Sequence, residues 1–161
     1  MFADISLPFG LSLRLMQPQD QAFAEMLFIS TRDYLYQMPI PKDQIDFLVK
    51  QQFVMQQASY ASTFPSAEAF IIEQYSQPIG KIILNNTLAN LHIVDIAFIN
   101  DMRGKGFGTS ILRALKKNAS QHSRALYLAV DQQNYRARKL YLSLGFTLIE
   151  SSSTHDTLFW N

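Results

Sequence analysis

The feature that most restricts the fold is a long apolar run that leads, through a glycine-rich segment, into a helical pattern. The run ANLHIVDIAFI (residues 89–99) predicts a strand, and the segment Arg103-Gly104-Lys105-Gly106-Phe107-Gly108 follows it closely. Glycines permit backbone conformations that other residues avoid, and they let a ligand approach the backbone. Amide N–H groups at the start of a helix point outward and carry partial positive charge. The segment therefore predicts a strand-to-helix turn that binds an anion, best suited to phosphate.

Two common phosphate motifs do not fit this segment. A P-loop requires G-x-x-x-x-G-K-[ST], and here no lysine precedes Thr109. A dinucleotide-binding turn requires G-x-G-x-x-G, whereas the glycines here follow G-x-G-x-G with no acidic residue at the end of a second strand. A nucleotide-binding α/β domain is therefore the weakest function class. An ordinary glycine-rich turn without a ligand remains the alternative.

Apolar spacing along the chain predicts the remaining elements. Strands are expected at residues 11–16, 67–74, 79–86, 89–99, 124–130, 146–151 and 156–160, and helices at 19–30, 43–63, 109–119 and 134–144. The order β-α-α-β-β-β-α-β-α-β-β predicts an α/β (mixed α+β) fold, with a mostly antiparallel sheet of about seven strands flanked by about four helices. The strand at 124–130 shows no polar alternation, which predicts burial on both faces.

Composition narrows the class of protein. The 161 residues predict a single domain over 1–161 with its core at about 11–160, and 48% hydrophobic content excludes a disordered chain. A net charge of +1 predicts neither a nucleic-acid partner nor a membrane partner. The absence of cysteine excludes disulfides, thiolate nucleophiles and cysteine-ligated metal. The first residues lack a secretory signal, so a cytoplasmic protein is expected.

A second informative segment, NYRARKLYLSLGF, runs from Asn134 to Phe146. Asn134 can cap the following helix or offer its amide to a ligand, and Gly145 is expected to end that helix. Tyr141 lies two turns after Asn134 on the same helix face. A capped amphipathic helix with Tyr141 in the core is the alternative to a ligand site.

Together and in this order, the two segments resemble the GCN5-related N-acetyltransferase (GNAT) superfamily. Arg103-Gly104-Lys105-Gly106-Phe107-Gly108 matches its acetyl-CoA signature [Q/R]-x-x-G-x-[G/A]. The later segment is similar to N-x-x-A-x-x-L-Y-x-x-x-G-F, with matches at Asn134, Ala137, Leu140, Tyr141, Gly145 and Phe146. The element order also fits the superfamily, so the resemblance extends from about residue 11 to the end.

The resemblance implies acetyl-CoA as cosubstrate and no metal. Amides of the glycine-rich segment would hold the pyrophosphate, the strand near Phe98 and Ile99 would pair with the pantetheine arm, and Asn134 would bind the pantetheine or the acetyl end. Arg136 and Lys139 are candidates for the 3′-phosphate, or else a solvated helix face. The implied cosubstrate-binding residues are Phe98, Ile99, Arg103, Gly104, Lys105, Gly106, Phe107, Gly108, Thr109, Asn134, Arg136, Ala137 and Tyr141.

Acetyl transfer to an amine requires a proton acceptor, an oxyanion donor and a proton for the leaving thiolate. The resemblance assigns the last proton to Tyr141 and the oxyanion donor to a backbone N–H near Phe98. His92 lies where the family commonly places a base, and histidine titrates in a suitable range. Asp95 is the second candidate; in a regular strand it faces away from His92, but a bulge would reverse this. The third candidate is a chain of water molecules that takes the proton without any single side chain acting as the base.

The acceptor site in this superfamily is usually lined by the loop between the first two helices. Here that loop, residues 31–38, contains Asp33, Tyr34 and Tyr36, which could hold an amine or simply pack as an aromatic surface loop. The resemblance implies an N-acetyltransferase that moves acetyl from acetyl-CoA to a primary amine of a small molecule or protein, by direct attack in a ternary complex. A non-catalytic acyl-CoA-binding module is the alternative. An open edge of the C-terminal hairpin would allow a homodimer.

Overall fold

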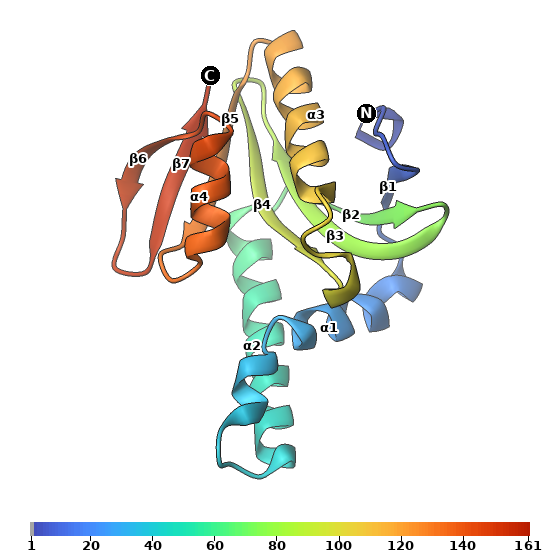
Figure 1. Ribbon diagram of the computed structural model, residues 1–161, viewed down its shortest axis with the longest axis vertical. Coiled ribbons are helices and arrows are strands. Elements are labelled where there is room, and N and C mark those ends of the chain that lie inside the picture. The colour runs from blue at the N-terminus through green and yellow to red at the C-terminus, as the bar shows by residue number, and fades with distance from the viewer. Residues whose placement is uncertain (1) are drawn as a thin grey trace.

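Residues 2–161, the part of the chain that the computed structural model describes, form one sheet of seven strands in the order β1-β2-β3-β4-β5-β7-β6 (Figure 1). Neighbouring strands are antiparallel except β4 and β5, which run parallel because a helix crosses over between them. The strands are β1 (Leu11–Leu15), β2 (Glu68–Gln74), β3 (Gln77–Asn86), β4 (Asn90–Phe98), β5 (Ala125–Asp131), β6 (Thr147–Ser151) and β7 (His155–Trp160).

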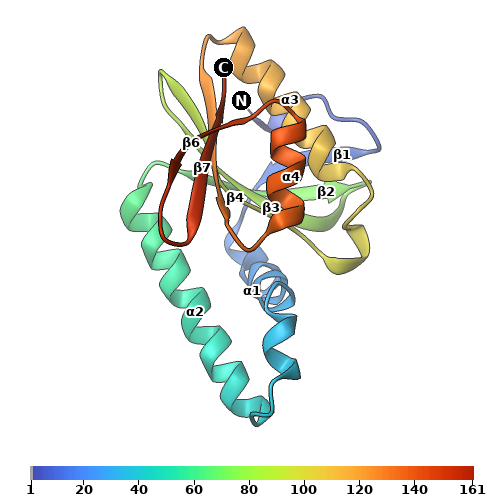
Figure 2. The same ribbon diagram turned by 60° about the vertical axis from the view of Figure 1, so that its left-hand side comes forward.

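The helices divide between the two faces of the sheet (Figure 2). They are α1 (Gln21–Ser30), α2 (Lys42–Thr63), α3 (Phe107–Gln121) and α4 (Tyr135–Ser143). Buried side chains of α3, including Ile111 and Leu115, share the main core with Ile82 and Leu91 of the sheet, and α4 packs against the same core through Ala137 and Tyr141. Helices α1 and α2 lie on the other face.

Helices α1 and α2 have a hydrophobic cluster of their own. Ala24 and Phe28 of α1 pack with Ile45, Val49 and Phe53 of α2. The far end of this helix pair extends well beyond the sheet (Figure 1), and the connection between the helices contains the short 3₁₀ helix η3 (Asp33–Gln37). At the end nearer the sheet, side chains of both helices, among them Phe28 and Tyr60, line a cavity together with residues of β4.

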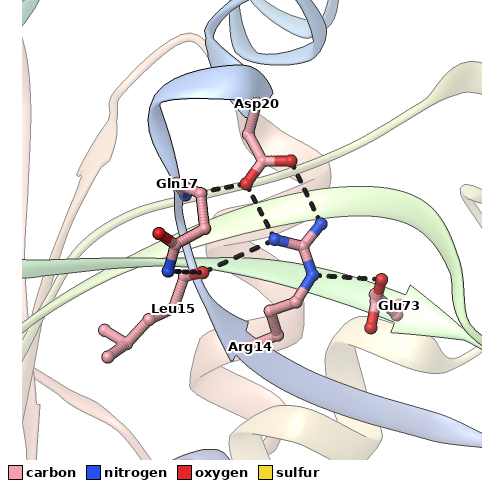
Figure 3. Close-up of polar contacts among 5 residues, drawn as sticks. All are labelled: Arg14, Leu15, Gln17, Asp20 and Glu73. Carbon is pink, nitrogen blue, oxygen red and sulfur yellow. Dashed lines mark hydrogen bonds and ion pairs between the residues drawn. The ribbon is translucent and has the colours of Figure 1, made fainter.

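An ion-pair network fixes the start of α1 (Figure 3). The Arg14 guanidinium donates from Nη1 to Asp20 Oδ2 at 2.7 Å and from Nη2 to Asp20 Oδ1 at 3.1 Å, while its Nε donates to Glu73 Oε2 at 3.2 Å. The Gln17 N–H also donates to Asp20 Oδ2, at 2.8 Å. Arg14 and this amide hold the pKa of Asp20 below its usual value. The network ties β1 to β2 and to the chain entering α1.

The predicted element order and fold class are confirmed, and most boundaries fall within two residues of those expected. The prediction that residues 124–130 are buried on both faces is wrong. Leu126, Leu128 and Val130 are buried, whereas Ala129 and Asp131 are exposed on the opposite face. On this less buried face Tyr127 stacks on Phe159 of β7, with ring centroids 5.8 Å apart, so apolar residues occur there without full burial. Within residues 2–161, no helix is long and apolar enough to cross a membrane.

Candidate active site

The site lies where β4 and β5 separate. These strands pair only from Asn90 with Ala125 to Ile93 with Leu128. Beyond this point β4 continues to Phe98 and β5 to Asp131 without a ladder between them. Backbone and side-chain groups near the centre of the sheet are therefore open to a ligand.

A bulge on β4 lies at the same point. Antiparallel pairing with β3 places His92 opposite Asn85 and Ile93 opposite Leu84, but Asp95 opposite Ile83. Val94 is the extra residue, so the side-chain alternation shifts by one position. The alternation predicted for a regular strand, with His92 and Asp95 on opposite faces, is thus reversed, as the bulge alternative anticipated.

Two cavities meet at this opening. The helix-side cavity has a volume of about 450 Å³ and is lined by residues of α1, α2, β3, β4 and β5, among them Phe28, Tyr60 and Lys81. The turn-side cavity has a volume of about 820 Å³ and is lined by the glycine-rich turn, the start of α3 and residues along the length of α4. The residues that line both are Thr31, Ile96, Ala97, Asn134 and Tyr141. A ligand that fills the turn-side cavity can therefore present one end to a ligand in the helix-side cavity.

The glycine-rich turn presents unused amide groups. Among the described residues, no backbone N–H from Gly104 to Thr109 donates a hydrogen bond to the protein. Gly104 and Gly106 have φ of +73° and +85°, the left-handed region that favours glycine, and a Cβ on Gly106 would meet no atom within 4 Å. The amides at the start of α3 thus border open space, which suits a phosphate group.

Arg103 and the adjoining 3₁₀ turn connect the glycine-rich turn to the end of α1. The Arg103 Nε donates to the Phe98 carbonyl at 2.9 Å, and its Nη2 donates to Ser30 Oγ at 3.4 Å. The Asn100 amide donates to Asp33 Oδ2 at 3.1 Å. These contacts hold the loop after α1 beside the turn-side cavity.

Asp95 and His92 line the helix-side cavity in different surroundings. Burial raises the pKa of the Asp95 carboxyl, and the charge of Lys81 opposes this effect only in part. Burial lowers the pKa of His92, whose ring lies edge-on to Phe64 with centroids 4.9 Å apart. At neutral pH, therefore, the histidine is held in its neutral form, while the carboxylate is a stronger base than an ordinary aspartate.

Tyr141 is set by helix α4 at the junction of the two cavities. Burial, followed by the charge of Asp95, raises the pKa of its hydroxyl, so the hydroxyl stays protonated. The Asn134 Oδ1 accepts a hydrogen bond from the Ala137 N–H at 3.2 Å, as expected for a helix cap. Asp156 of β7, which is 5% exposed, accepts a hydrogen bond from Arg138 Nε at 2.7 Å and anchors the helix to the sheet.

Most residues singled out from the sequence meet in these two cavities. His92 and Asp95 line the helix-side cavity, whereas Ile99 and Lys105 line neither cavity. The Ile99 N–H donates a hydrogen bond to the Ile79 carbonyl at 2.9 Å. Those lining the turn-side cavity are Phe98, Arg103, Gly104, Gly106, Phe107, Gly108, Thr109, Asn134, Arg136, Ala137, Lys139 and Tyr141. Lining a cavity is compatible with the cosubstrate-binding and catalytic roles expected for these residues, and those roles stay predictions.

Sequence reasoning missed Lys81 and Tyr60, which both line the helix-side cavity. Lys81 carried a signal, since it is a lysine inside the apolar strand IGKIIL. Tyr60 carried none, because only the packing of α2 against β4 brings it there. Of the predicted acceptor loop, Thr31 and Arg32 line the cavity, while Tyr34 and Tyr36 do not.

Comparison with known proteins identifies the family. The model of the acetyltransferase (GNAT) family matches residues 32–146, well over half of the chain, so the protein belongs to this family. No curated protein sequence matched the chain.

Solved structures share the fold at low sequence identity. The PaiA N-acetyltransferase from Thermoplasma acidophilum in complex with coenzyme A is 14% identical, with a TM-score of 0.67 over 92% of this chain and 97% of that one. An acetyltransferase from Thermus thermophilus is 18% identical, with a TM-score of 0.67 over 96% and 99%. Arabidopsis thaliana Naa50 in complex with the bisubstrate analogue CoA-Ac-MVNAL is 13% identical, with a TM-score of 0.61 over 94% and 99%. These similarities establish the GNAT fold.

Proposed function

We propose that the protein is an N-acetyltransferase that moves the acetyl group of acetyl-CoA to a primary amine in a ternary complex. The observation that supports this most directly is that two cavities meet at Tyr141. Free backbone amides border the turn-side cavity, and ionisable side chains line the helix-side cavity. A ternary complex requires this arrangement, since both substrates must reach the same atoms together. Relatives of the same fold are known in complex with coenzyme A and with acetyl-CoA.

The turn-side cavity suits acetyl-CoA. The amides from Gly104 to Thr109 would bind the pyrophosphate, because they have no acceptor in the protein and the start of α3 favours an anion. Arg136 and Lys139 line the same cavity and would add positive charge toward the 3′-phosphate. The unpaired edge of β4 beyond Ile93 would pair with the amides of the pantetheine arm.

The helix-side cavity would hold the amine, and Asp95 would accept the first proton from the ammonium. The free amine nitrogen then attacks the thioester carbon, and the carbonyl electrons move to the oxygen, where a backbone N–H near Phe98 would stabilise them. As the C–S bond breaks, Tyr141 gives its proton to the sulfur and recovers one from the acetylated nitrogen. The products are an amide and the free thiol, and one proton is left on Asp95 for solvent.

We favour Asp95 over His92 because Asp95 precedes Ile96 and Ala97, which line both cavities together with Tyr141, whereas His92 lies in the stretch of β4 that is paired with β5. Burial lowers the pKa of His92, and its ring packs against Phe64. His92 is the second candidate for the same step.

The proposal is tested by following thiol release from acetyl-CoA with a panel of small primary amines and N-terminal peptides. Amine-dependent release, together with the acetylated product by mass spectrometry, is the expected result. Tight acetyl-CoA binding with no release for any amine would instead support the non-catalytic binding module.

A further inference from the structure

Lys81 is a buried cation without an ion pair in the wall of the helix-side cavity. It lies on β3 opposite Ala97, and its side chain lines the cavity although the residue is only 7% exposed. Among residues 2–161 its ammonium group takes part in no hydrogen bond and no ion pair within 4 Å. A buried charge without a partner destabilises a protein, so a position like this points to a partner supplied by a ligand.

Arg32 supplies a second cation in the same wall. Its guanidinium stacks on the Phe28 ring, with Cζ 4.5 Å from the ring centroid. The Nε donates to Gln52 Oε1 at 3.1 Å and Nη1 donates to Thr31 Oγ1 at 3.2 Å. Among the described residues Nη2 has no acceptor in the protein, so the side chain is held in place with donors to spare.

The helix-side cavity is lined by both basic and acidic side chains. The ionisable side chains that line it, apart from tyrosine, are Arg32, Lys81, His92, Asp95, Asp131 and His155. Lys81 and Asp95 line the same cavity without forming an ion pair within the described residues, so the two groups face a common space. A molecule with an amine and an anionic group close together would satisfy both at once.

We propose that the acceptor is a small amino carboxylate, such as a free amino acid, whose amine faces Asp95 and whose carboxylate binds Lys81 and Arg32. This inference rests on the proposed function, because it names the substrate of that same site. A volume of about 450 Å³ suits a molecule of this size. Leu27, Phe28 and Phe64 leave an apolar part of the wall for its side chain. A bound carboxylate would also favour the charged form of Lys81, which burial disfavours by lowering its pKa.

The test compares L-amino acids with their α-amides, which keep the amine and remove the carboxylate charge. Binding is measured by calorimetry on protein saturated with coenzyme A, and turnover by thiol release from acetyl-CoA. At least one amino acid should bind about tenfold to hundredfold more tightly than its amide, the range expected for a hydrogen-bonded charge. Lys81→Met should abolish this ratio, while Lys117→Met, an exposed lysine of α3 outside both cavities, should preserve it.

Lys81→Met is also expected to keep or raise the melting temperature without acceptor, since it removes a buried, unpaired charge, and this separates lost recognition from lost folding. Preference for neutral amines or for protein N-termini, or an unchanged ratio in Lys81→Met, would overturn the inference while leaving an acetyltransferase. Tight binding of an amino acid but not of its amide, without any turnover, would support the ligand class inferred here and remove both its role as acceptor and the proposed function.

Discussion

His92 and Asp95 lie on the same face of β4 although three positions separate them along the strand. They pair with Asn85 and Ile83, which are two residues apart on β3, and Val94 is the unpaired residue between them. Both side chains consequently line the helix-side cavity. The bulge therefore gives one cavity two candidate proton acceptors, which mutation can separate.

The first prediction concerns the pH dependence of catalysis. Because burial raises the pKa of Asp95, kcat/KM should rise with pH through an apparent pKa above the ordinary carboxyl value of 3.8. Asp95→Asn should remove this rise and lower kcat by about 10²–10⁴-fold, the usual loss for an acid–base group. His92→Gln should keep it. Rates measured from low to neutral pH provide the comparison.

The acceptor amine also titrates, so the profile is repeated with an α-amide, whose amine is less basic. A rise that moves with the amine belongs to the substrate rather than to the enzyme. If His92→Gln removes a rise that Asp95→Asn retains, the proton acceptor is the histidine.

The second prediction concerns Tyr141. Tyr141→Phe should lower kcat by about 10²–10⁴-fold with little change in the affinity for acetyl-CoA, because only the hydroxyl is lost. The ring contact with Phe146, at a centroid distance of 6.1 Å, should remain. Tyr127→Phe, on a ring that stacks on Phe159 outside both cavities, is the matched control. A kcat equal to that of the control would return Tyr141 to a purely packing role.

The third prediction concerns the glycine-rich turn. At a concentration one hundred times its dissociation constant, acetyl-CoA should stabilise the wild-type protein by about 2.7 kcal/mol, seen as a higher melting temperature. Gly106→Ala should abolish most of this stabilisation, since its methyl group would stand in the open space beside the free amides. NAD and ATP should stabilise far less.

Gly145→Ala controls for backbone strain. Gly145 also has a positive φ, +94°, and its added methyl would make ordinary contact with Trp160 at 3.5 Å. Both variants should lose about 1–2 kcal/mol of folding stability. Only Gly106→Ala should lose the effect of acetyl-CoA, and equal losses in both would disconnect the turn from the ligand.

The elements were predictable because local signals and tertiary structure agree in this chain. The helix that Asn134 caps begins at Tyr135, and Gly145 follows its end with a positive φ. In the turn before α3, Gly104 and Gly106 adopt the left-handed backbone conformation that a glycine-rich turn predicts. The strand at residues 125–131 misled because its second face is apolar without being buried: Ala129 lines the helix-side cavity and Tyr127 stacks on Phe159.

The site was predictable only where its residues are close in sequence. The glycine-rich turn and helix α4 each carry a continuous motif, so their residues could be chosen together. Lys81, Arg32 and Tyr60 come from three separate elements and meet only through the packing of α1 and α2 on the sheet. The orientation of Asp95 depended on a single inserted residue in the pairing of β3 and β4, which no local pattern shows.

The last prediction concerns stability in acid. Because the pKa of Asp20 is lower in the folded protein than in the unfolded chain, the folded state binds fewer protons, and stability falls as pH decreases. The contribution is complete above about pH 5 and is lost as the pH falls through 3.8, the ordinary value, and below. Asp20→Asn should reduce the free energy of unfolding at pH 7 by about 1–3 kcal/mol, since Asp20 is 8% exposed and bonded to Arg14.

Asp101→Asn, at an exposed aspartate for which the structure gives no ion pair among residues 2–161, should leave the stability unchanged. Urea unfolding between pH 7 and pH 3 should show the Asp20→Asn and wild-type curves converging toward acid, and a constant difference across that range would contradict the assignment.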